Sequence, residues 1–138
     1  MARMTKEEIS ALMDAGFPDW RSFSTIESVG ERDLVLRMPF RTQLLRAGGT
    51  ISGPAMMALA DTAAYFLTLA QAGPVVAGAA TANLDIHFLS RPHPVDVIAT
   101  ATLLRLGRRL SVATVDLRSS NDLVAHATVT YALPPMPK

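Results

Sequence analysis

Alternating apolar and polar residues predict that much of the chain forms β-strands. The clearest case is residues 81–89, in which two sets of side chains alternate with a period of two. One face carries Ala82, Leu84, Ile86 and Phe88. The other face carries Thr81, Asn83, Asp85 and His87. Segments rich in β-forming residues and separated by turn residues predict five more strands, at 22–29, 33–40, 95–106, 110–118 and 123–133.

Two segments break this pattern and predict helices. Residues 54–72 are almost continuously apolar, with Pro54 suited to the first helical turn and Gly73-Pro74 suited to the stop. Residues 1–16 predict a short amphipathic helix, in which Thr5 and Glu8 have the spacing of a capping box. The order of elements is therefore helix, two strands, long helix, four strands.

This order predicts one α+β domain over residues 1–138, with a curved antiparallel sheet wrapped around a long central helix and a proline-rich tail at 134–138. A chain of 138 residues has room for one core and no second domain. The outer face and the edges of the sheet still need cover, and pairing between subunits would supply it. We expect a homo-oligomer, either a dimer or a dimer of dimers.

Composition narrows the possible partners. The formal charge of +1 is spread along the chain without a block of like charges, which argues against nucleic acid or a membrane surface as partner. There is no cysteine and no pattern of a signal peptide, so we expect a cytoplasmic protein. His87, His93 and His126 lack the spacing of metal ligands, and no metal site is expected.

Asp61 is the strongest candidate for chemistry, because a carboxylate inside an apolar helix is costly to bury unless it is paired or lines a cavity. The structural alternative is a salt bridge to an arginine or a hydrogen bond to a neighbouring hydroxyl. The loop at 48–54 leads into the helix N-terminus, where the Gly53 N–H is the best donor to an oxyanion and the Ser52 hydroxyl is a possible helper. Asp61 lies seven residues after Pro54, roughly 10 Å along the axis. Antiparallel helices from two subunits would bring Asp61 of one subunit to Gly53 of the other.

The chain resembles the hotdog-fold thioesterases of the phenylacetate-pathway (PaaI-like) type over about residues 40–131. Thr50, Gly53, the run 59–63, the strand 81–89 and Gly107-Arg108-Arg109 carry this resemblance. It implies hydrolysis of an acyl-CoA, with Asp61 activating water or attacking the thioester and a partner's Gly53 N–H holding the oxyanion. Thr81 falls where some members place a hydroxyl that positions the water, and Asn83 shares its predicted strand face, so we expect one or the other to approach Asp61 across the subunit interface.

The resemblance also implies that Arg108 and Arg109, in a hairpin turn, bind the phosphates of coenzyme A, which enters as part of the substrate and not as a cofactor. The chain departs from the family pattern at three positions, since the family's histidine falls on Ser52, its second glycine on Pro54 and its upstream asparagine near Arg46. These departures keep open a non-catalytic binder of acyl-CoA or a lipid-like ligand. A hydratase on the same fold is a third alternative, although no histidine lies near Asp61 in sequence.

Overall fold

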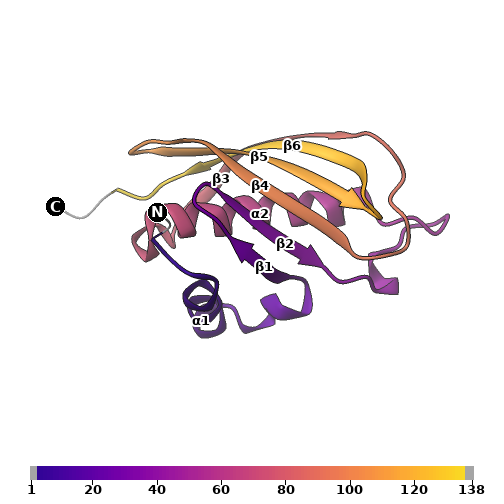
Figure 1. Ribbon diagram of the computed structural model, residues 1–138, viewed down its shortest axis with the longest axis horizontal. Helices are drawn as coiled ribbons and strands as arrows, with labels where there is room; N and C mark the ends of the chain where they lie inside the picture. The colour runs from indigo at the N-terminus through magenta and orange to yellow at the C-terminus, as the bar shows by residue number, and fades with distance from the viewer. Residues whose placement is uncertain (1–2, 136–138) are drawn as a thin grey trace.

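The computed structural model describes residues 3–135 and contains one six-stranded antiparallel sheet in the order β1-β2-β4-β5-β6-β3. The strands are β1 (Thr25–Val29), β2 (Asp33–Met38), β3 (Ala80–Phe88), β4 (Val97–Leu106), β5 (Leu110–Ser119) and β6 (Asp122–Ala132). The helices are α1 (Lys6–Gly16) and α2 (Gly53–Ala72), with single 3-10 turns η1 (Pro18–Ser22), η2 (Thr42–Leu44) and η3 (Pro74–Val76). The sheet curves over α2, which lies lengthwise against one face (Figure 1).

Helix α2 forms the centre of the core because small and large apolar side chains alternate on the side that meets the sheet. Four of its alanines, Ala60, Ala63, Ala64 and Ala70, are nearly inaccessible and let the sheet approach closely, while larger side chains such as Phe66 fill the space between the layers. The helix begins with Ser52 as N-cap, whose Oγ accepts a hydrogen bond from the Ala55 N–H. It ends at Gly73, whose φ of 91° favours glycine.

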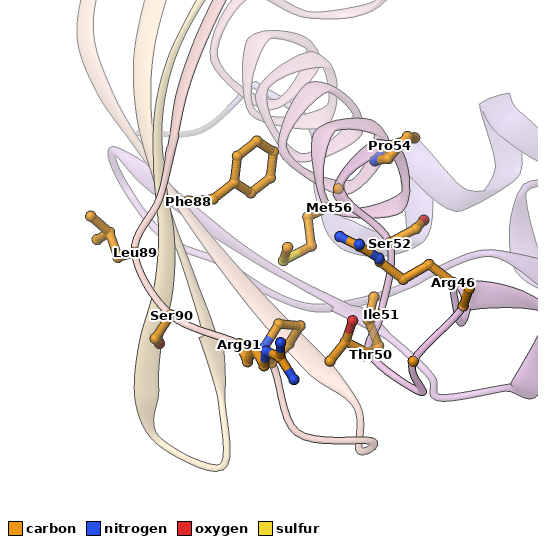
Figure 2. A pocket seen from close by; sticks show the side chains of 14 residues that line it. Arg46, Thr50, Ile51, Ser52, Pro54, Met56, Phe88, Leu89, Ser90 and Arg91 are labelled. Atoms are coloured by element: carbon orange, nitrogen blue, oxygen red, sulfur yellow. The ribbon is translucent and has the colours of Figure 1, made fainter.

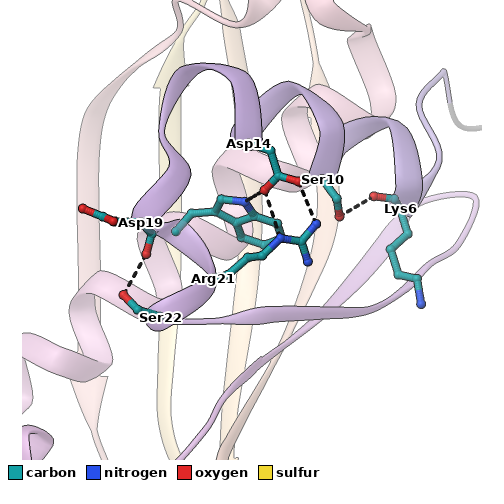
Figure 3. A network of polar contacts seen from close by, with 7 residues as sticks. Lys6, Ser10, Asp14, Asp19, Arg21 and Ser22 are labelled. Atoms are coloured by element: carbon teal, nitrogen blue, oxygen red, sulfur yellow. Dashed lines mark hydrogen bonds and ion pairs between the residues drawn. The ribbon is translucent and has the colours of Figure 1, made fainter.

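A second layer covers one side of α2 and is formed by α1 and η1. The predicted capping box is present, since Thr5 and Glu8 exchange hydrogen bonds at the start of α1. Asp14 near the end of α1 accepts hydrogen bonds from the indole N–H of Trp20 and from the guanidinium of Arg21 (Figure 3). These contacts fix Trp20, which is buried and packs edge-to-face on Phe66 at 5.5 Å between ring centroids.

The predicted α+β architecture, a curved antiparallel sheet around a long helix, is confirmed, and most predicted boundaries agree within two residues. The strand predicted at 22–29 begins later, at Thr25, because the chain first completes η1 and seats Trp20. Residues 1–2 of the predicted first helix and 136–138 of the predicted tail lie outside the described residues. The hairpin between β5 and β6 turns through Ser120 and Asn121, both at positive φ, as a tight two-residue turn requires.

Candidate active site

Asp61 lies in the middle of α2 and is half-buried. Two hydroxyl groups from the sheet donate to the same carboxylate oxygen. The Thr81 hydroxyl lies 2.7 Å from Oδ1, and the Tyr131 hydroxyl lies 2.8 Å from Oδ1 and 3.2 Å from the Asp61 backbone oxygen. Among the described residues, no donor lies within hydrogen-bond distance of Oδ2, and no arginine or lysine pairs with Asp61. Within the described residues, Asp61 thus has no salt bridge, but the other form of the structural alternative, hydrogen bonds to neighbouring hydroxyl groups, is present.

Thr81 reaches Asp61 because β3 contains a bulge. Thr81 pairs with Tyr131 of β6, but Asn83 pairs with the preceding residue, Thr130, so Ala82 is the extra residue. The bulge turns Thr81 toward the helix together with Leu84 and Ile86. The predicted alternation, which put Thr81 and Asn83 on one face, is therefore wrong at this point.

Asn83 accordingly lies on the opposite face of the sheet from Tyr131 and does not approach Asp61 within this chain. Thr81 makes its contact within its own chain, whereas the sequence predicted an approach across the subunit interface. A single inserted residue thus separates the two candidates that the sequence grouped together.

Tyr131 is the residue of this site that the sequence did not identify. It is 5% exposed, and its ring packs against the ring of Tyr65 at 5.7 Å between centroids. Burial raises the pKa of the Tyr131 hydroxyl well above its usual range, and the nearby Asp61 carboxylate raises this pKa further. The hydroxyl is therefore protonated at neutral pH and can act as a donor. A buried tyrosine needs a partner for its hydroxyl, and this requirement was the available sequence signal.

A cavity of about 470 Å³ opens beside Asp61. Six aromatic side chains from three parts of the chain line it; they are Phe17, Trp20, Phe23, Tyr65, Phe66 and Tyr131. Met13 and Ala58 complete the apolar lining. Asp61 is one of two carboxylates at this cavity, the other being Asp19. The site therefore combines a carboxylate with space for an apolar group.

Gly53 lies at the N-terminus of α2 and lines a different cavity of about 790 Å³. Figure 2 shows Arg46 extending from the glycine-rich loop toward this cavity and Arg91 entering from the segment after β3. No residue lines both cavities, and eight residues of helix, roughly 12 Å, separate Gly53 from Asp61. As the sequence indicated, one subunit does not bring the two together.

The remaining candidates lie apart from Asp61. Ser52 acts as the N-cap of α2, so its Oγ already accepts a backbone hydrogen bond. Arg108 and Arg109 are exposed in the turn between β4 and β5, and Arg108 lines a smaller cavity with Gln71 near the C-terminal end of α2. The predicted phosphate-binding arginines and Gly53 are therefore at opposite ends of the helix.

Comparison with known proteins agrees with this geometry. Residues 48–131 match the family model described as the thioesterase superfamily, and the chain belongs to that family. The matched segment contains Asp61, Thr81 and Tyr131, and it begins within the loop that precedes Gly53.

Relatives support the same assignment. A candidate thioesterase from Silicibacter sp. TM1040, known from a crystal structure, has 34% sequence identity to this chain. The two structures superpose with a TM-score of 0.87 over 98% of this chain and 95% of that one. A candidate esterase of Halobacterium salinarum is 30% identical over 71% of this chain and 67% of that protein. The thioesterase HI1161 of Haemophilus influenzae, at 21% identity and a TM-score of 0.83 over 98% of this chain and 94% of that one, shares the fold.

These comparisons confirm the hotdog fold and the superfamily. Within residues 3–135, no helix has both the length and the apolar composition needed to cross a membrane.

Proposed function

We propose that this protein hydrolyses an acyl-CoA thioester to a free acid and coenzyme A, at a site shared by two subunits. The observation that carries the proposal is the half-buried Asp61 carboxylate, oriented by two hydroxyl groups at the edge of an apolar cavity. Membership of the thioesterase superfamily supports thioester hydrolysis as the reaction class. The cavity would hold the acyl group, and its aromatic wall suits a flat or compact apolar chain.

In this scheme, Asp61 acts as general base or as nucleophile. As a base, Oδ2 accepts a proton from water while the water oxygen bonds to the thioester carbonyl carbon. The tetrahedral intermediate then collapses, the C–S bond breaks, and the thiolate of coenzyme A leaves and is protonated. As a nucleophile, Oδ2 forms the bond to carbon itself, the C–S bond breaks with departure of the thiolate of coenzyme A, and water later hydrolyses the resulting anhydride to the free acid and the Asp61 carboxylate. In both routes, negative charge develops on the carbonyl oxygen.

The donor to that oxygen would be the Gly53 N–H of the partner subunit. Gly53 starts α2, where backbone N–H groups are free of helical acceptors and the helix dipole favours negative charge. Since Gly53 and Asp61 line separate cavities of one chain, a partner's helix must supply the missing half. The exposed edge strand β3, with its exposed Phe88, is the surface through which we propose that the subunits pair.

The phosphates of coenzyme A have two candidate binding pairs. Arg108 and Arg109 form the pair that the family resemblance implies, and both are exposed beside the turn of the β4–β5 hairpin. Arg46 and Arg91 form a second pair, which lines the same cavity as Gly53 and would enter the shared site with it. Arginine suits either position because its planar group matches a phosphate. Loss of the binding pair should raise KM more than it lowers kcat.

The first test is the release of free thiol from a panel of aryl and medium-chain acyl-CoAs by the native chain and by Asp61→Asn. We expect native turnover and a loss of at least about 100-fold in kcat in the variant, since a general base contributes about that much. Size-exclusion chromatography checks that the oligomer is intact. Native binding of acyl-CoA without turnover on any substrate would instead identify the ligand-binding alternative, and hydration of an enoyl-CoA would identify a hydratase.

A further inference from the structure

We propose that Tyr131 is a positioning residue for this hydrolysis, which fixes the Asp61 carboxylate jointly with Thr81 so that only Oδ2 faces the reacting water. This inference rests on the proposed function. The scheme needs a carboxylate in one orientation, yet a free aspartate side chain on a helix samples several rotamers. The structure identifies the groups that restrict it.

The two hydroxyls act on one oxygen from opposed strands. Thr81 and Tyr131 are direct cross-strand partners in the β3–β6 pair, so their side chains emerge side by side on the helix-facing side of the sheet. Each places its hydroxyl within 2.8 Å of Oδ1. With both donors on Oδ1, that oxygen has little remaining capacity to accept a proton from water. The carboxylate is therefore asymmetric, and Oδ2 is the oxygen available for chemistry.

Tyr131 is the more rigid of the two donors. Its ring is buried against Tyr65, whereas Thr81 is exposed on the edge strand. Its hydroxyl is also within 3.2 Å of the Asp61 backbone oxygen, so it contacts both the side chain and the helix backbone at this residue. Because β6 lies inside the sheet and is paired on both sides, the position of this hydroxyl is set by the sheet itself. Tyr131 thus links the helix to the sheet at the reacting group.

A purely structural role predicts a different result. If Asp61 served only to satisfy a buried tyrosine, removing the hydroxyl would change stability and leave the catalytic constants alone. If Tyr131 served only as a wall of the acyl cavity, Tyr131→Phe would keep that wall, and any effect would fall on KM. A positioning role instead lowers kcat with KM nearly unchanged, because orientation of the base matters in the reacting complex.

The experiment measures kcat and KM of Tyr131→Phe, Thr81→Val and the double variant with the best substrate of the panel. Each single variant should lose on the order of tenfold in kcat, with KM within about twofold of native. Thr81→Ser, which keeps the hydroxyl, should retain most of the native kcat. Thr130→Val is the matched control, since it removes a hydroxyl from the neighbouring β6 residue on the opposite face of the sheet. It should leave both constants unchanged.

The double variant tests whether the donors act together. Two donors on one oxygen hold it redundantly, so losing both should lower kcat by more than the product of the two single losses. A strictly multiplicative double variant would contradict joint positioning. An unchanged kcat in Tyr131→Phe, or a change confined to KM, would overturn the role of Tyr131 while leaving the proposed hydrolysis intact.

Two controls separate the possible failures. If the native chain turns over and Asp61→Asn does not, the proposed function holds and the Tyr131 result is decisive. If the native chain shows no turnover on any thioester, both proposals fall together. Should Tyr131→Phe fold poorly, as judged by its melting temperature, the surface variant Thr81→Val tests the same oxygen, and a native kcat in that variant would overturn joint positioning.

Discussion

Asp96 shows how one side chain closes the end of the sheet. Its Oδ1 accepts a hydrogen bond from the Phe40 N–H at 2.6 Å, and its Oδ2 lies 3.0 Å from Nη1 of Arg37. The Phe40 hydrogen bond is the main reason that the pKa of Asp96 lies below its usual range, and Arg37 adds to this effect against partial burial. The contact ties the segment after β2 to the start of β4, next to the loop that leads to α2.

The lowered pKa predicts a pH-dependent contribution to stability. The folded state holds the ionised form more strongly than the unfolded state, so this contribution is present above the ordinary aspartate pKa of about 3.9 and is lost as pH falls through the lower folded value. We expect Asp96→Asn to lower the free energy of unfolding by about 1 kcal/mol at pH 7, because the group is partly exposed and screened.

Urea denaturation at pH 7 and at pH 3 measures this difference, which should shrink at the lower pH. Glu31→Gln is a suitable control, since it removes a charge from an exposed position whose carboxylate has no ion pair within the described residues. Its effect should stay within about 0.5 kcal/mol at both values. An Asp96→Asn difference that is equal at pH 7 and pH 3 would contradict the electrostatic explanation.

At the scale of elements, the N-terminus of α2 depends on Ser52. The Ser52 side chain satisfies the Ala55 N–H at 3.2 Å, and Pro54 lacks an N–H that would need a partner. We therefore expect Ser52→Ala to destabilise the protein by about 1 kcal/mol, whereas Ser52→Asp should keep the cap and complement the helix dipole. Urea midpoints at matched protein concentration measure both effects. Equal destabilisation by alanine and aspartate would show that capping is not the function of Ser52.

The sequence predicted the secondary-structure elements more completely than it predicted the candidate active site. Periodicity and turn residues predicted the strands and both helices, because burial of one face imposes a period on many residues at once. The bulge at Ala82 has no such signature, since one extra residue between Thr81 and Asn83 leaves the alternation of the letters unchanged. Tyr131 was missed for a related reason, because its contact with Asp61 depends on strand order and register, which pair residues 70 positions apart.

At the scale of the whole molecule, the edge strand β3 is the feature that most needs a partner. It is paired on one side only, by β6, and nearly all its residues are exposed in the single chain. Phe88 is 49% exposed. A Cβ atom placed on Gly53 would lie 3.5 Å from the Phe88 ring, so the two residues are close neighbours. The unpaired edge and the proposed oxyanion donor are therefore neighbours, and pairing along β3 would bring a second subunit close to Gly53.

A shared site makes a prediction that a site within one chain does not. Asp61→Asn removes the carboxylate, and Gly53→Pro removes the proposed oxyanion donor. Proline should fit at Gly53, because this is the first residue of α2 and the preceding Ser52 is already extended, at φ −69° and ψ 149°. Each variant alone should be nearly inactive. In a mixed dimer, however, the native Asp61 of one chain meets the native Gly53 of the other, which restores one complete site of the two.

Denaturing the two variants together and refolding them at equal concentration should therefore recover about a quarter of native turnover, since about half of the dimers are mixed and each has one working site. Thiol release measures the recovery, and mass spectrometry of differently tagged chains under native conditions counts the mixed dimers. As a control, the two variants are mixed without denaturation, which measures how much activity arises from slow exchange of subunits between native dimers. If both catalytic groups came from one chain, every mixed dimer would contain two damaged sites. Mixed dimers without activity would thus indicate that Asp61 and its oxyanion donor belong to a single subunit. We expect recovery of activity instead, because Asp61 and Gly53 line separate cavities of one chain.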